Sequence, residues 1–268
     1  MAGRAAGRTG HRPAGACGSD ACGAAPGWQP RTSMSIINSI ADSSEGLALG
    51  ALVGALLGPA AAATSVTVPD RVWPWQRDPA RWLLGRPATR RRCVLMTGFG
   101  AVVLGGLAAA IGWRPALAAF LLLGVIGLTL AAIDLEHHRL PDRLTMTGAL
   151  CCAAVLLVDA VQMGSWTPLL RGLLCAVVAF AAFLLMALIS PSGMGFGDVK
   201  LIALLSLHTG WLGWELAVLA ALAGFAAGAL ASLVLIVTGR ATMRTAIPFG
   251  PALLVGAWLV VVALGPLG

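Results

Sequence analysis

Residues 192–200 read SGMGFGDVK and lie between two long apolar runs, so that the carboxylate of Asp198 stands at the edge of a hydrophobic segment beside several glycines and a lysine. An acidic side chain there is unfavourable unless it faces protein or water, which makes Asp198 a candidate functional residue. The glycines permit positive φ and close backbone approach, and they suit a non-helical segment leading into the next span. Residues 192–200 therefore predict both a span boundary and a site.

A second acidic segment, residues 134–142 (DLEHHRLPD), occupies a similar position after an earlier apolar run. Asp134 follows that run directly, and Asp142 follows Pro141 where the next run begins, in the position of a helix N-cap. Two carboxylate-bearing boundaries in an otherwise apolar chain suggest an aspartyl hydrolase. The remainder of the sequence has to be consistent with that hypothesis.

The composition is that of an integral membrane protein. Of the 268 residues, 58% are hydrophobic and 11% charged, and the mean hydropathy is +0.87, whereas a soluble domain carries about 25% charged residues. The apolar runs are about 20 residues long, as helical spans require. The predicted fold is an all-α polytopic bundle of about eight transmembrane helices, at residues 46–67, 93–112, 116–133, 143–162, 168–189, 199–210, 215–238 and 247–265.

The chain is expected to consist of a tail and one membrane domain. Residues 1–40, rich in Gly, Ala, Arg and Pro, predict a disordered tail or a start-site extension, since Met34 would serve equally well as a start. Residues 41–268 form the expected transmembrane domain. Asp42 has the pattern of a helix N-cap, with Glu45 as its capping-box partner. Glycines at four-residue spacing predict close contacts between helices: Gly50, Gly54 and Gly58, and later Gly224 and Gly228.

The basic residues predict the orientation in the membrane. Seven of seventeen arginines lie in residues 69–92, interleaved with tryptophans, and this mixture beside a span is more typical of a membrane interface than of nucleic-acid binding. With residues 69–92 cytoplasmic, the inner loops carry twelve Arg and Lys residues, and the outer side, the tail aside, carries Arg114 and Arg171. The four arginines of the tail would then lie outside.

This orientation places Asp134 and Asp198 at the same cytoplasmic boundary, because two spans separate them. Two carboxylates within about 3 Å share one proton, so that the ionised member can activate water while the protonated member polarises a peptide carbonyl. Simpler roles remain for each residue alone. Asp198 could be a helix N-cap, and Asp134 could pair with Arg139 or Arg143 at the end of its span.

At these residues the chain resembles the aspartic prepilin peptidases of bacterial type IV pilus and type II secretion systems. The resemblance covers about residues 46–265 and is carried by Asp134 and Asp142 in DLEHHRLPD, by GFGDVKL, and by IPFGP at 247–251. It implies a multi-pass peptidase of the bacterial inner membrane that removes the basic leader of prepilin-like precursors on the cytoplasmic side. Its partners would be those precursors and the lipid bilayer, with no nucleic acid.

The resemblance also implies the roles of single residues. The catalytic pair maps to Asp134 and Asp198, whereas Asp142, with Pro141, is assigned to the start of the next span. Gly195 and Gly197 would shape the backbone beside Asp198. Lys200 could neutralise charge or reach substrate, and the physical expectation is that it extends to the interface.

The sequence departs from larger family members in one respect. Those members carry two CxxC pairs in the first cytoplasmic loop, and many also methylate the new pilin N-terminus. Residues 69–92 contain no cysteine pair, so no metal site and no cofactor are expected, and methylation of the product has no support in the sequence.

Three other interpretations fit part of the sequence. A presenilin-like intramembrane protease would share the GxGD pattern, but DLEHHRLPD argues against it. A proton- or cation-coupled transporter could use Asp134 and Asp198 as relays, although transporter carboxylates usually lie near the bilayer midplane in repeated halves, and no internal repeat is found. A degenerate member serving as a scaffold is disfavoured by the presence of both aspartates.

Overall fold

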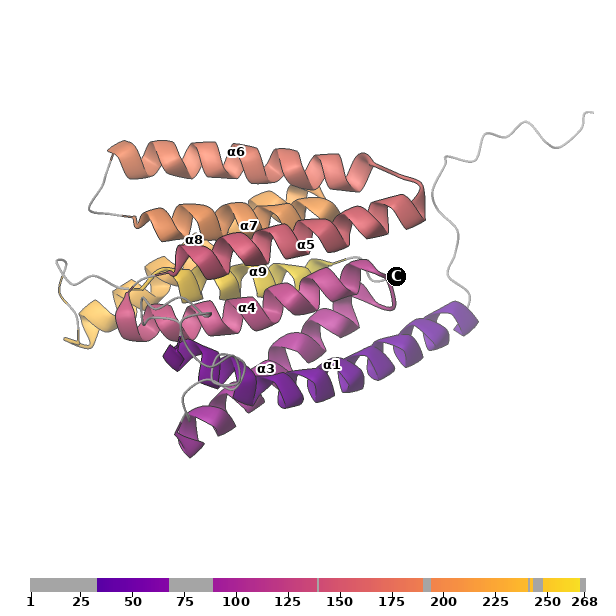
Figure 1. Cartoon of the computed structure of the whole chain (residues 1–268), viewed down its shortest axis with the longest axis horizontal. Helices are drawn as coiled ribbons and strands as arrows, with labels where there is room; N and C mark the ends of the chain where they lie inside the picture. The colour runs from indigo at the N-terminus through magenta and orange to yellow at the C-terminus, as the bar shows by residue number, and fades with distance from the viewer. Residues whose placement is uncertain are drawn as a thin grey trace, which may run out of the picture.

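The structure is a computed structural model that describes residues 33–67, 89–138, 140–189, 194–240, 242 and 248–265. In these residues every regular element is an α-helix, and most of the eight helices lie roughly along one direction, while α3 crosses them obliquely, as Figure 1 shows. Six of them are long and apolar enough to cross a membrane. The predicted fold class, an all-α polytopic membrane protein, is confirmed.

The helices match the predicted spans closely. Their bounds are α1 Ser33–Thr67, α3 Arg90–Ile111, α4 Ala116–His137, α5 Asp142–Met163, α6 Thr167–Ile189, α7 Phe196–Leu212, α8 Trp214–Val237 and α9 Gly250–Leu264. The two shortest, α7 with 17 residues and α9 with 15, are not among the six candidate spans.

The first helix begins earlier than predicted, although the apolar span within it, Ser44–Val66, agrees with the predicted span 46–67. α1 begins at Ser33, inside the segment assigned to the tail, and runs without interruption through Asp42 and Glu45. Asp42 is therefore not an N-cap, because a cap residue must leave the helical conformation. Residues 33–45 contain neither Gly nor Pro, so nothing in them ends the helix toward its N-terminus. Residues 1–32 lie outside the described part of the chain.

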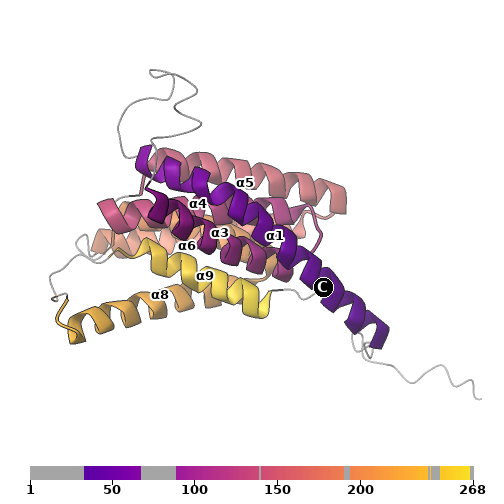
Figure 2. The same ribbon diagram turned by 90° about the horizontal axis from the view of Figure 1, so that it is seen from below.

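The glycine stripe of α1 packs against α3, as predicted. A Cβ added at Gly54 would overlap the carbonyl oxygen of Gly100, and one added at Gly58 would lie 2.6 Å from the Cα of Thr97. Backbone therefore lies against backbone along this contact, which only residues without a side chain allow. Figure 2 shows α1 and α3 side by side over much of their length.

The second glycine pair holds α8 against α9. A Cβ at Gly224 would lie 2.9 Å from Leu253, and one at Gly228 would overlap the ring of Phe249. Figure 2 places α8 and α9 next to each other. This contact fixes the start of α9, which matters for the site described below.

α7 is enclosed by other helices. It packs against α5, α6, α8 and α9, and nearly all of its residues from Asp198 to Trp211 are buried. Arg171 of α6 donates hydrogen bonds to the carbonyl oxygens of Gly210 (2.7 Å) and Trp211 (2.5 Å). These carbonyls belong to the last turn of α7, whose acceptors have no partner within the helix. Arg171 therefore fixes one end of α7 against α6.

Replacing Gly54 by Ala should destabilise the protein, because the new methyl group overlaps the Gly100 carbonyl. Overpacking of this kind lowers the free energy of unfolding by about 1–3 kcal/mol. The matched control is Gly98→Ala on α3, where an added Cβ meets nothing within 4 Å and the better helix propensity of Ala offsets any loss. The measurement is reversible unfolding of detergent-solubilised protein by SDS. Equal stability of the two variants would contradict the close α1–α3 contact.

Candidate active site

Asp134 lies in the last turn of α4 and points into the bundle, with 5% of its surface exposed. Its Oδ2 accepts a hydrogen bond from the backbone N–H of Gly250 at 3.0 Å. Gly250 is the first residue of α9, and the free N–H groups at a helix N-terminus favour a negative charge. The Asp134 carboxylate is thus buried but paired with a donor that stabilises its ionised form.

Gly250 is a site residue that the sequence analysis did not identify. A Cβ at this position would lie 2.8 Å from Asp134 Oδ2, so a larger residue would displace the carboxylate. The sequence signal was present, since Gly250 lies inside the IPFGP segment. Its partner could not be read from the sequence, however, because 116 positions separate the two residues.

Asp198 lies in the first turn of α7, ahead of the apolar part of that helix and outside the six candidate spans. Its side chain is buried, and Oδ1 has no hydrogen-bond partner among the described residues. Gly195, with an extended backbone, occupies the N-cap position, so Asp198 is not the N-cap that the simpler alternative required. A buried carboxylate oxygen without a protein partner is suited to carry a proton or to bind water.

Gly195 and Gly197, the two glycines just before Asp198, do not adopt positive φ, and only Gly197 is closely packed. Gly195 has φ −73°, and Gly197 lies within α7. A Cβ on Gly197 would lie 2.8 Å from the Cβ of Leu140, whereas one on Gly195 would make only ordinary contact with Asp198 at 3.5 Å. Of the two properties that the glycines permit, positive φ is not used at Gly195 or Gly197, and close approach is used at Gly197, where space is limiting.

The two aspartates lie at the same end of the bundle, as the spacing predicted. Leu140 lies close to both Gly197 and Gly250, so the segment that follows Asp134 meets the starts of α7 and α9. Burial, and secondly the negative charge of Asp134, raise the pKa of Asp198 to about 6, while the Gly195 backbone partly offsets the rise. The two carboxylates are close enough to influence each other's ionisation.

Asp142 and Lys200 form an ion pair between α5 and α7, with Lys200 Nζ 2.7 Å from Asp142 Oδ1. Asp142 was predicted to cap α5, but the N-cap is Pro141, whose extended backbone fills that position. The Asp142 carboxylate is therefore free to reach across to α7. Lys200 does not extend to the interface either, because its side chain is only 16% exposed and its Nζ lies 4.5 Å from the centre of the Phe196 ring.

Among the described residues, no three His, Cys, Asp or Glu side chains lie together as a metal site would require. Most of residues 69–92, on which the sequence-based expectation of no metal rests, lie outside the described part.

The fold and the site define a class: a polytopic helical membrane protein with a buried carboxylate pair at one end of its bundle. Comparison with known families then gives a model match, over residues 121–233, to the type IV leader peptidase family. The matched region contains both Asp134 and Asp198. Over these residues the chain resembles the members of this family.

Several curated proteins are similar to the chain, and the three described here all carry the name prepilin leader peptidase/N-methyltransferase. Those of Aeromonas hydrophila (33% identity), Pseudomonas putida (32%) and Stutzerimonas stutzeri (28%) align over 72%, 50% and 65% of this chain. The chain spans 64%, 46% and 56% of their respective lengths. No solved structure matches the chain.

The Asp142–Lys200 pair should contribute modestly to stability, because Asp142 is 65% exposed and solvent screens such pairs to about 1 kcal/mol or less. The measurement is a double-mutant cycle of Asp142→Asn, Lys200→Met and the two combined, using unfolding in SDS. We also expect Asp142→Asn to retain most of whatever activity the protein has. A coupling of several kcal/mol would show that the pair behaves as a fully buried bridge and would contradict this expectation.

Proposed function

We propose that this chain is a membrane-embedded aspartyl endopeptidase that removes the basic leader of type IV pilin-like precursors at the cytoplasmic face of the bacterial inner membrane. The observation that carries the proposal is the pair of buried carboxylates, Asp134 and Asp198, held by the ends of α4 and α7. The match to the type IV leader peptidase family and the names of the similar proteins support the substrate class. The arginine distribution supports the cytoplasmic side.

The surroundings of the two carboxylates suggest a division of labour. The N–H of Gly250 donates to Asp134 and offsets part of the cost of burying a negative charge there, whereas Oδ1 of Asp198 has no partner among the described residues, and burial and the charge of Asp134 favour its protonated form. In the proposed reaction, Asp134 takes a proton from water as the water oxygen adds to the scissile carbonyl carbon, and Asp198 gives its proton to the carbonyl oxygen. When the C–N bond breaks, the proton on Asp134 passes to the leaving nitrogen, and a hydroxyl group of the tetrahedral intermediate returns a proton to Asp198, so that both acids recover their starting states.

The surrounding contacts serve this chemistry by holding the two acids in place. Gly250 binds the Asp134 carboxylate in the last turn of α4, and Leu140 packs against Gly197 in the first turn of α7. An acid and a base held rigidly by packed neighbours need little rearrangement to reach the transition state. The proposal covers cleavage of the peptide bond, and methylation of the product is not part of it.

Replacing either Asp134 or Asp198 by Asn should reduce leader cleavage about a hundred- to ten-thousand-fold, because each replacement removes one partner of the shared proton and keeps the shape. The matched control is Asp159→Asn on α5, another buried aspartate for which the proposed mechanism has no role. The measurement is cleavage of a leader-bearing pilin precursor at equal membrane expression. Normal cleavage by both Asp134→Asn and Asp198→Asn would rule out the aspartyl mechanism.

Activity should fall as the pH rises through about 6. The working pair carries one proton, and that proton leaves as the pH passes the pKa of Asp198, which is about 6. Because the ratio kcat/KM reports ionisations of the free enzyme, its alkaline limb should show an apparent pKa near this value. The measurement is kcat/KM over roughly pH 5 to 9, and a flat profile across that range would be incompatible with a shared proton.

A further inference from the structure

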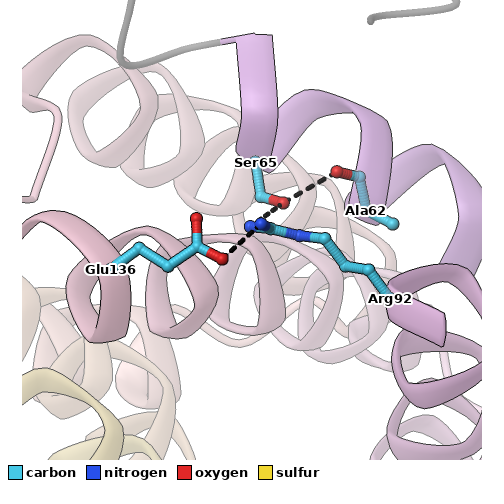
Figure 3. Close-up of polar contacts among 4 residues, drawn as sticks. All are labelled: Ala62, Ser65, Arg92 and Glu136. Carbon is cyan, nitrogen blue, oxygen red and sulfur yellow. Dashed lines mark hydrogen bonds and ion pairs between the residues drawn. The ribbon is translucent and has the colours of Figure 1, made fainter. Parts of the chain in front are cut away.

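One guanidinium connects three helices at the end of the bundle that carries Asp134 (Figure 3). Arg92, in the first turn of α3, forms an ion pair through Nη1 with Oε1 of Glu136 on α4. Its Nη2 donates a hydrogen bond to Ser65 Oγ on α1 at 2.8 Å. Ser65 in turn donates to the carbonyl oxygen of Ala62 in its own helix at 2.8 Å. The ends of α1, α3 and α4 therefore share a single charged side chain.

The Arg92 side chain is mostly removed from solvent. It is 17% exposed, compared with 48% for Glu136, and Ser65 is fully buried. Its Nε is buried without a hydrogen-bond partner among the described residues. A guanidinium in such surroundings is strongly unfavourable without its partners, so its contacts with Glu136 and Ser65 hold it in one position.

Contacts with other helices, and not the dipole of α3 itself, stabilise the charge of Arg92. A cation in the first turn of α3 opposes the dipole of its own helix. Ser65 and Glu136, however, lie in the last turns of α1 and α4, where the negative end of each helix dipole attracts a cation. The charge of Arg92 thus stabilises the ends of two neighbouring helices.

The last turn of α4 is held from two sides. Asp134 and Glu136 are two residues apart, which places them on roughly opposite faces of the helix. Gly250 contacts the first face through Asp134, and Arg92 contacts the second through Glu136. The helix ends immediately afterwards, at His138 with φ 50°. Because terminal turns fray unless other contacts hold them, these two contacts determine where the Asp134 carboxylate lies.

We infer that Arg92 is a positioning residue for the proposed peptidase. Through Glu136 and Ser65 it fixes the last turn of α4, and it thereby fixes the position of the Asp134 carboxylate relative to Asp198. The inference rests on the proposed function for its catalytic consequence. Its structural part, the fixing of the last turn of α4, can be measured without any activity.

The kinetic test uses three variants: Arg92→Gln, Glu136→Gln, and a double variant in which the two charges are exchanged (Arg92→Glu together with Glu136→Arg). The control is Arg91→Gln, which removes an exposed arginine from the same helical turn. We expect Arg92→Gln and Glu136→Gln each to lower kcat about ten- to a hundredfold with KM unchanged, because small displacements of a catalytic group have effects of this size. The exchanged pair should recover part of the loss, and Arg91→Gln should resemble the unmodified protein.

The second measurement is hydrogen exchange of the full-length protein in detergent, followed by mass spectrometry. Arg92→Gln should speed exchange in the last turn of α4 by about tenfold and leave the first turn of α5 unchanged, since only the former loses a contact. The two proposals can fail separately. If the unmodified chain cleaves no pilin precursor but Arg92→Gln still speeds exchange in the last turn of α4, the proposed function is wrong and the positioning role of Arg92 stands.

Two results would overturn the inference. One is unchanged exchange in the last turn of α4 in Arg92→Gln. The other is a loss of cleavage that follows only the fraction of folded protein, with kcat per folded molecule equal to that of Arg91→Gln. A residue with a merely structural role would give the second result, because it would lower the amount of enzyme without changing the geometry of the carboxylates.

Discussion

The hydrogen bond from the Gly250 amide to the Asp134 carboxylate is the contact on which this end of the molecule depends. A carboxylate in apolar surroundings needs a donor, and the start of α9 supplies one that has no partner within its own helix. The donor is in place only because α9 is fixed against α8, where the backbones of Gly224 and Gly256 approach so closely that a Cβ on either would overlap a neighbour. Small residues far from the carboxylates therefore determine their geometry.

The second carboxylate is held in a different way. Asp198 belongs to α7, whose two ends are both fixed by charged side chains from neighbouring helices. Arg171 binds the last carbonyls of α7, and Asp142 pairs with Lys200 near its start. Because both ends are attached, α7 cannot slide along its axis without breaking a charged contact. The two acids thus depend on separate sets of contacts that meet at Leu140.

Local patterns in the sequence were sufficient for the architecture. Apolar runs of span length located the helices, and the number of spans between Asp134 and Asp198 placed both at one end, since each span reverses the direction of the chain. Glycine spacing predicted close helix contacts on α1 and α8, but not that the partners would be α3 and α9. What remained hidden were pairings between distant positions, namely Gly250 with Asp134, Lys200 with Asp142, and Arg92 with Glu136. Local propensity carries no information on such partners, and for this reason Asp142 was mistaken for a helix cap.

The enclosure of α7 has a consequence for how the sequence can vary. α6 buries only Leu169, Gly172 and Cys175, so most of its surface faces lipid, and any apolar residue of suitable helix propensity satisfies that environment. α7 meets protein on nearly every side, where shape as well as polarity constrains each position. Substitutions should therefore accumulate freely along α6 and rarely along α7, although the two helices lie next to each other.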